Sequence, residues 1–553
     1  MRFERELGFD RAANKRPLLD EIAVSSSAFK ACERIDATSG AALARSFAGH
    51  MLEDIGRVLG GSAIARFFLK GTDYRMVASK SLVVGLIASL YEKARGRISR
   101  LTTGSKGLSS RWREVFAGSR VSDYTRFLFR YESGVVFLTV FIPVELFSLQ
   151  YLPRAVKYSV ELVLLLMTTS LFLSALTKRR DLIWTELELP VAALIGVVAI
   201  SAVVNSVPPV IAVAGLRALL QFYLLYFVVV QADFDLDWLK RFVLGLIGLA
   251  IVLALFGLSQ KITGVRTPEL LVDVRETTIE GRIISTFANP NNFGGFLLLV
   301  LPVAIALVAM RVGPGVRLIA GFGAVAMLPA LMFTYSRSAW LGFAAALVVL
   351  ASMLDRRLLL GLLIAAVAAV AVVPSVIDRV AFGLSSSYMA ASAAGGRLLY
   401  WSKALEIFAM SPIVGAGPGR FGGAVAAVFG SPVHALVGIA PNYKLWVDSQ
   451  IFQVLAELGL LGLAAFLWVP ATFARNAIAF FSEAEDPFWK AVAAGATASV
   501  VGVVAQGTFV GVWETHQIGA FFWLVMAIVM SVAAKRERRG LSAKSRKAFG
   551  GRR

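Results

Sequence analysis

Long apolar runs separated by short polar connections fill the chain from about residue 135 to residue 534. Each run approaches the roughly 17–25 residues that an α-helix needs to cross a bilayer. Backbone groups inside a bilayer must be paired within the segment, so runs of this kind are predicted to be helices. The pattern predicts an all-α integral membrane protein with about 12 transmembrane helices, at 135–151, 158–176, 185–204, 208–231, 240–259, 291–310, 317–333, 339–354, 358–376, 450–470, 491–509 and 517–534.

The basic residues of the short connections predict the orientation of these helices. When successive segments cross the membrane in alternating directions, three groups of basic residues fall on the same side. They are Lys178, Arg179 and Arg180, then Arg311 and Arg317, and the basic tail 535–553. Short loops rich in Lys and Arg stay in the cytoplasm. Both termini are therefore expected in the cytoplasm. Two long connections, 260–290 and 377–449, are expected on the outer face, the second one between helices 9 and 10.

Composition supports the membrane assignment and limits the other possibilities. Of the 553 residues, 57% are hydrophobic and only 17% are charged, which is outside the usual range of soluble domains. The formal net charge of +20 comes from residues that flank apolar segments and fill the tails, where anionic membrane lipids are the expected partner rather than nucleic acid. The single cysteine, Cys32, excludes a disulfide framework.

The first 130 residues form a separate region that is polar and rich in arginine. Its one apolar stretch, SLVVGLIASLY at 81–91, is too short to span a bilayer. A partly helical cytoplasmic extension is predicted for 1–130, either as an amphipathic helix at the membrane surface or as a small helical domain. The N-terminal stretch has no early apolar core, so a cleavable signal peptide is not expected.

Metal and cofactor chemistry is not expected from this sequence. The only histidines, His50, His434 and His516, are far apart, and no Cys, His or carboxylate cluster has the spacing of metal ligands. The glycine-rich stretch GAGPGRFGG (415–423) lacks the Lys-Ser/Thr of a phosphate-binding loop. It is interpreted as a tightly turned or re-entrant loop.

Three arginines at the predicted outer surface are the main chemical signal, because outer loops normally have few basic residues. They are Arg282, Arg337, in a short turn between two spans, and Arg397, which follows two glycines at a helix start. Each alone is consistent with a side chain that extends to the interface or caps a helix. Three at one depth favour an anion site, because a guanidinium donates two parallel hydrogen bonds to a phosphate and stays charged. A lipid diphosphate would lie at this depth.

Polar and aromatic residues accompany the arginines. Asn289 and Asn291 flank a proline that is typical of a helix start after Arg282, and Tyr400 and Trp401 follow Arg397 on a predicted helix. They are expected to contribute to substrate binding. His434, Tyr443 and Lys444, from the same outer connection, are secondary candidates.

Four motifs in order, RIISTFANPNNFGG, TYSRSAWLG, GGRLLYWSKALEIFAMSPIVGAGPGRF and DSQIFQVLAELGLLG, resemble the O-antigen ligase and Wzy-type polymerase family. The resemblance covers roughly residues 185 to 534. It implies a metal-independent, inverting glycosyltransferase of the bacterial inner membrane, whose donor is an undecaprenyl-diphosphate-linked glycan on the periplasmic face. It also implies that Arg337 and Arg397 bind the diphosphate. Arg282 matches the family pattern less closely and is implied in the same role.

One departure from the family pattern bears on the reaction. Ligases of this family typically have a His-Asn pair before the last motif, and Asp448 and Ser449 stand there in this chain. Inverting transfer needs a group that takes the proton of the acceptor hydroxyl. Asp448 is the candidate base, with capping of the following helix as the structural alternative. Glu457, inside that helix, is expected to have a buried role such as fixing an arginine.

The resulting hypothesis is a polymerase that joins lipid-linked repeat units of an exopolysaccharide or O-antigen, with a glycan as acceptor. Other polysaccharide export and chain-length proteins are further candidate partners. An O-antigen ligase that transfers the glycan to lipid A core is the close alternative, and a protein O-oligosaccharyltransferase is a third. An anion transporter is the alternative from another class, but carriers place ionisable groups at the bilayer midplane. Here Arg217 and Glu457 are the notable exceptions in otherwise apolar spans.

Overall fold

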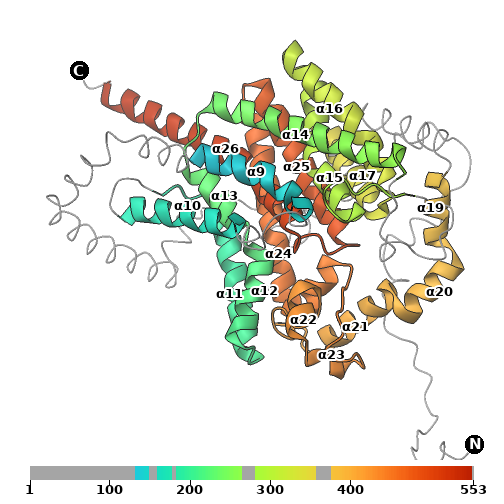
Figure 1. Cartoon of the computed structure of the whole chain (residues 1–553). Helices are drawn as coiled ribbons and strands as arrows, with labels where there is room; N and C mark the ends of the chain where they lie inside the picture. Colours follow the sequence, from blue (N-terminus) through green and yellow to red (C-terminus); the bar gives the residue numbers. More distant parts are fainter. Residues whose placement is uncertain (1–130, 149–158, 177–181, 265–280, 356–374, 551–553) are drawn as a thin grey trace, which may run out of the picture. The chain divides into compact units, whose positions relative to one another are not determined.

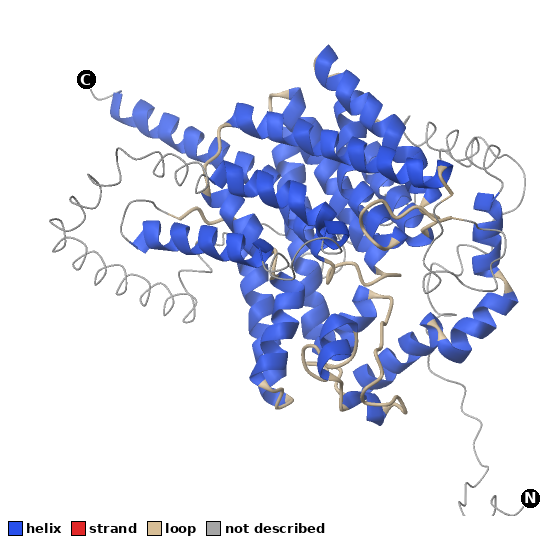
Figure 2. Cartoon of the chain, viewed as in Figure 1, coloured by secondary structure: helices blue, strands red, loops and turns tan. Residues whose placement is uncertain are grey.

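The computed structural model consists of helices joined by loops and turns, and Figure 2 shows no strand in the part of the chain that it describes. Four predicted features fall outside that part: the extension 1–130, the basic residues 178–180, residues 265–280 of the first outer connection, and nearly all of the predicted span 358–376. The described residues are 131–148, 159–176, 182–264, 281–355 and 375–550.

Six of the described helices are long and apolar enough to cross a bilayer, and a bent pair of shorter helices is a seventh candidate. The chain is therefore a multi-pass, all-α membrane protein. The total of about 12 spans stays a prediction. The six are α14 (Leu236–Ile262), α15 (Pro290–Ala309), α16 (Pro314–Phe333), α24 (Gln450–Glu483), α25 (Pro487–Gly507) and α26 (His516–Gly550), and the bent pair is α12 (Pro209–Leu220) with α13 (Tyr223–Gln231).

Other predicted spans and the second outer connection are also helical. Figure 1 shows that the connection predicted at 377–449 folds into a series of short helices rather than an open loop. Helices also occupy four more predicted spans, and three of these are apolar but short. The four are α9 (Tyr131–Ser148), α10 (Ser159–Leu176), α11 (Glu188–Val204) and α17 (Arg337–Met353), and the connection contains α19 (Ser375–Leu384), α20 (Ser386–Gly395), α21 (Arg397–Met410), α22 (Gly423–Phe429) and α23 (Val433–Leu436).

The predicted span at 208–231 is a bent pair of helices, because α12 and α13 meet at a break with a bend of 54°. The break lies next to Gln221, whose side chain accepts a hydrogen bond from Arg217 at 3.2 Å. Arg217 also pairs with Glu161 of α10, with 2.5 Å between the charged atoms. The polar side chains of α12 are thus turned towards α10, which explains how an arginine is accommodated in an apolar segment.

Small residues allow the central helices α15, α17 and α25 to pack closely. A Cβ atom added at Gly342 of α17 would lie 2.5 Å from the carbonyl oxygen of Gly502 in α25. One added at Gly495 of α25 would lie 2.4 Å from the Cα of Val303 in α15. Membrane helices associate through this kind of close backbone packing, because lipid supplies no hydrophobic drive between them. These contacts make a rigid base for the loops at the helix ends.

Helix α24 begins where predicted but extends beyond residue 470 to Glu483 and is interrupted at Gly459, which has φ 64° and ψ −161°. The interruption frees backbone groups inside the helix, and the preceding loop pairs with them. Leu460 donates its N–H to the carbonyl of Pro412 at 2.9 Å, and Gly417 donates to the carbonyl of Glu457 at 2.9 Å. The loop is thereby inserted against the break, as expected for irregular backbone that is buried in protein.

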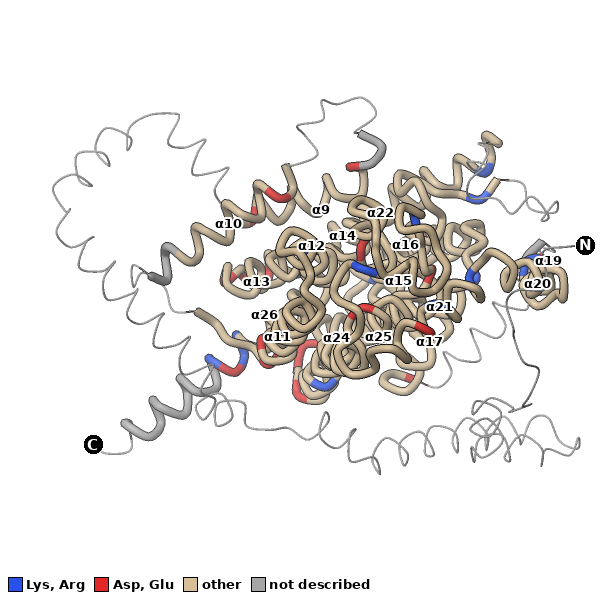
Figure 3. Tube along the Cα trace, turned by 90° about the horizontal axis from the view of Figure 1, so that it is seen from below, with Lys and Arg blue, Asp and Glu red and all other residues tan. Residues whose placement is uncertain are grey.

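The two ends of the helix bundle differ in their charged groups. At one end Lys240 pairs with Asp486, and Lys535 pairs with Asp233. At the other end lie the turn 334–336 and the loop 281–289, joined by a backbone hydrogen bond of 3.1 Å between Ile283 and Phe333. Figure 3 shows that charged positions are few along the described helices. Arg379 of the second connection donates to the carbonyl of Tyr335 at 3.1 Å, so the described residues of both connections reach this end of the bundle, where the three predicted arginines lie.

Candidate active site

Three helices begin at this end of the bundle with the same local structure. Each of α15, α17 and α24 starts with a polar side chain that caps the first turn, and a residue with positive φ precedes each cap. Such backbone conformations cost free energy in residues other than glycine and gather at functional sites. The caps are Asn289, Ser336 and Ser449, and the residues before them are Ala288 (φ 55°), Tyr335 (φ 49°) and Asp448 (φ 51°).

Arg282 connects the first outer loop to the starts of α15 and α17. Its Nε donates to the carbonyl of Thr334 at 3.0 Å, and an Nη donates to Oδ1 of Asn291 at 3.3 Å. The hydroxyl of Ser336 donates to the same Asn291 oxygen at 2.8 Å. Asn291 itself is held by the Asn289 cap at 2.8 Å. The predicted helix start and the predicted arginine therefore form one hydrogen-bonded unit.

Arg337 is the first residue of α17 and extends to α19 and α20. Its guanidinium carbon lies 4.7 Å from the centroid of the Tyr388 ring, a cation–π arrangement. A Cβ at Gly383 would be only 1.7 Å from Nη1 of Arg337, so the guanidinium fits against α19 because residue 383 has no side chain. That Nη1 has no hydrogen-bond partner among the described residues. A buried cationic donor without a partner is suited to an incoming anion.

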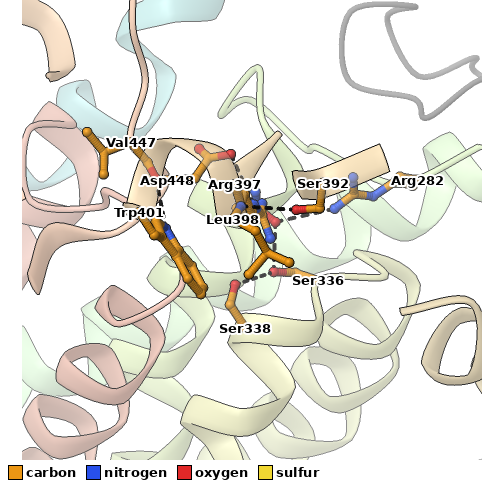
Figure 4. Close-up of polar contacts among 10 residues, drawn as sticks. Arg282, Ser336, Ser338, Ser392, Arg397, Leu398, Trp401, Val447 and Asp448 are labelled. Atoms are coloured by element: carbon orange, nitrogen blue, oxygen red, sulfur yellow. Dashed lines mark hydrogen bonds and ion pairs between the residues drawn. The ribbon is translucent and has the colours of Figure 1, made fainter. Parts of the chain in front are cut away.

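Arg397 is the first residue of α21, and it pairs with the predicted base. Its Nε lies 3.0 Å from Oδ2 of Asp448, and both side chains are partly exposed. Trp401 fixes the backbone beside this pair by donating its indole N–H to the carbonyl of Val447 at 3.0 Å. Figure 4 shows Arg397 between Asp448 and Arg282. Ser449, rather than Asp448, caps α24, so the capping alternative for Asp448 is wrong.

The three arginines influence one another electrostatically. Burial, and next the positive charges of Arg397 and Arg337, lower the pKa of Arg282 to about 10. A cation whose neighbours are also cations is destabilised until an anion arrives. The amino ends of α15, α17 and α21, where these arginines lie or make contact, add partial positive charge. The arrangement is therefore preorganised for a multiply charged anion.

A pocket of about 380 Å³ adjoins Arg397 and Asp448. Such a volume is within the range of small-molecule sites. Its wall combines aromatic rings, two cations and one carboxylate, so it offers stacking surfaces as well as hydrogen bonds. The lining residues are Tyr388, Ala391, Ser392, Gly395, Gly396, Arg397, Tyr400, Tyr443, Lys444, Trp446 and Asp448.

The structure brings most of the predicted site residues together but not His434. Tyr400 and Lys444 line the pocket, and Trp401 lies behind it against Phe452, with ring centroids 5.1 Å apart. His434 is completely buried, and its Nε2 lies 2.7 Å from the carbonyl oxygen of Phe421. That contact holds the connection after the glycine-rich loop, and the histidine is not part of the pocket wall.

Two buried glutamates hold the glycine-rich loop. Glu457 is buried, as expected, but its partners are not the arginine that was given as an example: its carboxylate accepts backbone N–H groups of Gly419 at 2.7 Å, Phe421 at 3.1 Å and Gly422 at 3.3 Å. Glu514, which the sequence interpretation did not identify, accepts from Ala424 at 2.6 Å. Burial raises the pKa of Glu514. The loop is tightly turned, as predicted, and backbone donors rather than an arginine satisfy the carboxylate.

Tyr388 and Gly383 were also missed, although both contact Arg337. Neither residue type is distinctive in sequence, and only folding brings α19 and α20 to the arginine. Among the residues that the structure describes, no group of three or more His, Cys, Asp or Glu side chains is arranged to hold a metal ion.

Comparison with known families matches residues 322–467 to the model of the O-antigen ligase family. The matched segment includes Arg337, Arg397 and Asp448, whereas Arg282 lies before it. Residues 322–467 are therefore similar to an O-antigen ligase family domain. Members of this ligase and polymerase-type family are membrane glycosyltransferase-like enzymes. No curated protein matches the chain.

Proposed function

We propose that this O-antigen ligase family protein polymerises glycan repeat units carried on undecaprenyl diphosphate, as a metal-independent, inverting glycosyltransferase. The observation that carries the proposal is the convergence of Arg282, Arg337 and Arg397 at helix starts, beside a pocket that contains Asp448. A diphosphate joined to a sugar needs a cationic site next to a pocket. Ligation to lipid A core uses the same donor and remains the close alternative.

The arginines are assigned to the leaving group. In inverting transfer the acceptor hydroxyl attacks the anomeric carbon while the bond from that carbon to the diphosphate oxygen breaks, and the bonding electrons leave with the diphosphate. Preorganised guanidinium groups stabilise the charge that develops there. Removal of one such donor from a site of this kind typically costs about 100- to 1,000-fold in turnover.

Asp448 is assigned to the proton of the acceptor hydroxyl. In the structure its carboxylate accepts a hydrogen bond from Arg397. A bound diphosphate competes for the same guanidinium, so donor binding would release a carboxylate oxygen to accept the proton. This order of events would couple the base to the presence of the donor. Ligases of the family typically have a His-Asn pair where this chain has Asp448 and Ser449. This difference favours a polymerase over a ligase.

The proposed location is the bacterial inner membrane, with both termini in the cytoplasm and the site on the periplasmic face. The ion pairs of Lys240 and Lys535 lie at the end of the bundle opposite the arginines. This separation supports the orientation, because basic residues concentrate on the cytoplasmic side. The lipid-linked donor would reach the arginines from the outer leaflet.

Deletion of the gene, followed by gel analysis of the surface glycan, tests the proposal. Single repeat units on lipid A core indicate a lost polymerase, whereas free lipid-linked polymer indicates a lost ligase. Complementation with Arg397→Ala and Asp448→Asn should fail to restore polymer. Glu406→Gln is a matched control, because Glu406 is an exposed carboxylate of α21 that pairs only locally with Lys403.

Two results would contradict the assignments. Polymer of normal length from the Asp448→Asn variant would refute the base. A transporter would be favoured by two results together. The wild type would show no sugar transfer, and anion flux into proteoliposomes would survive both Arg337→Ala and Arg397→Ala.

A further inference from the structure

We infer that the pocket beside Arg397 is a saccharide subsite that holds a sugar ring of the glycan, and that Lys444 gives it a preference for a sugar carrying a carboxylate. The inference rests on the proposed function, since it names the sugar class at the same site. It is carried by the composition of the pocket wall, which differs from that of the arginine cluster next to it.

The aromatic residues of the wall suit a pyranose ring. Tyr443 and Trp446 line the pocket and are each about half exposed, at 48% and 53%. Tyr and Trp present an apolar face and a polar edge, and a sugar ring likewise has an apolar C–H face and a rim of hydroxyls. Stacking against these rings would bury the exposed aromatic surface.

The hydroxyls of the wall are already oriented for polar contacts. Tyr400 and Tyr443 share a hydrogen bond of 2.9 Å between their hydroxyls. Only one of the two hydroxyls donates in that bond, so the pair keeps one donor and several acceptor positions for a ligand. Burial, followed by the contact with Tyr443, raises the pKa of Tyr400 to about 12, which keeps its hydroxyl protonated.

Charge decides which sugar the pocket favours. The lining contains Arg397, Lys444 and Asp448, and Arg397 is paired with Asp448 at 3.0 Å. The ammonium of Lys444 is therefore the charge that this pair leaves uncompensated in the wall. A carboxylate on the bound ring, as in a uronic acid, would complement it.

The position of the pocket links this subsite to the reacting bond. Arg397 and Asp448 are both in its wall, and Tyr388 contributes to the wall while Arg337 lies over its ring. A ring in the pocket would thus lie directly beside the site assigned to the diphosphate. The subsite would select the sugar at or next to the bond that is made or broken.

Binding of a matched pair of small sugars to the full-length protein in lipid nanodiscs tests the inference. The probes are methyl glucuronide and methyl glucoside, which differ in one carboxylate, and saturation-transfer NMR measures direct binding without any transfer reaction. The wild type should bind both, the glucuronide up to about fivefold more tightly, as expected for an ion pair with a solvent-exposed lysine. Lys444→Met should remove this preference.

Two further variants separate the pocket from general effects of charge. Gly395→Phe should abolish binding of both sugars, because a Cβ at Gly395 meets open space and the new ring fills the pocket without displacing the backbone. Lys403→Met removes a lysine that pairs with Glu406 outside the pocket, and it should keep the preference.

Equal affinity for the two sugars, or a preference that survives Lys444→Met, would overturn the selection by Lys444. Binding that survives Gly395→Phe would overturn the subsite itself. The proposed function is checked separately by polymer formation from lipid-linked repeat units. A wild-type protein that binds the glucuronide but forms no polymer and ligates no glycan would refute the function while supporting the subsite.

Discussion

Replacement of Glu457 by leucine tests whether this buried carboxylate holds the glycine-rich loop in place. In the native structure Glu457 is 6% exposed and accepts three backbone N–H groups, at 2.7, 3.1 and 3.3 Å. Leucine has a similar size but accepts no hydrogen bond. Each buried donor left without a partner costs about 1–3 kcal/mol. Since the loop can relax and such costs are not additive, we expect a local loss of about 3 kcal/mol.

Hydrogen exchange measured by mass spectrometry can detect this loss locally. A decrease of about 3 kcal/mol in the free energy of loop opening speeds exchange in residues 415–423 by roughly a hundredfold. Glu457→Gln retains one carbonyl oxygen and should give an intermediate rate, and Glu406→Gln is the control at an exposed carboxylate. Unchanged protection of residues 415–423 in the leucine variant would refute the idea that the carboxylate anchors this loop.

Three other predictions follow from the same contacts. Burial raises the pKa of Glu514 above its ordinary value of 4.5, so its protonated form is favoured on folding. Its contribution to thermal stability should rise as the pH falls through the raised pKa towards 4.5, and Glu514→Gln should flatten this part of the stability profile. Gly383→Ala should lower sugar transfer by about a hundredfold without loss of folded protein, because the new methyl group occupies the position of the Arg337 guanidinium. Gly245→Ala, which meets open space, should have no effect, and equal activity of the two variants would contradict the role of Gly383 in placing Arg337. Trp401→Phe removes the 3.0 Å hydrogen bond to the carbonyl of Val447, so the backbone before Asp448 should loosen. We expect kcat to fall more than KM rises. A change in KM alone would assign Trp401 to binding instead.

The apolar runs by themselves predict a helical membrane protein, because a bilayer leaves few other ways to pair the backbone. They also locate most helix starts: α15 begins at Pro290 and α24 at Gln450, as the capping residues indicate. The apolar run at 208–231 is long enough for one span, and the polar residues within it, Arg217 and Gln221, do not by themselves reveal that α12 and α13 are separated by a bend. The pairing of Arg217 with Glu161 is a contact between helices that are distant in sequence.

For the site, the sequence identifies Arg282, Arg337, Arg397 and Asp448 as candidates, because charged groups are rare at the outer ends of spans and four motifs resemble a known family. Only the tertiary structure determines their relations. The pairing of Arg397 with Asp448 and the position of Arg337 over Tyr388 depend on how the helices of the outer connection fold back onto the bundle.

Glu457 shows the same distinction at one residue. A carboxylate within an apolar segment indicates that some buried partner exists, since an isolated charge there is costly. The sequence cannot say whether that partner is an arginine or a set of backbone N–H groups, because both satisfy a carboxylate. The interruption of α24 at Gly459 and the insertion of the glycine-rich loop against it decide the matter. Local pattern determines which groups need partners, and long-range packing determines which partners they find.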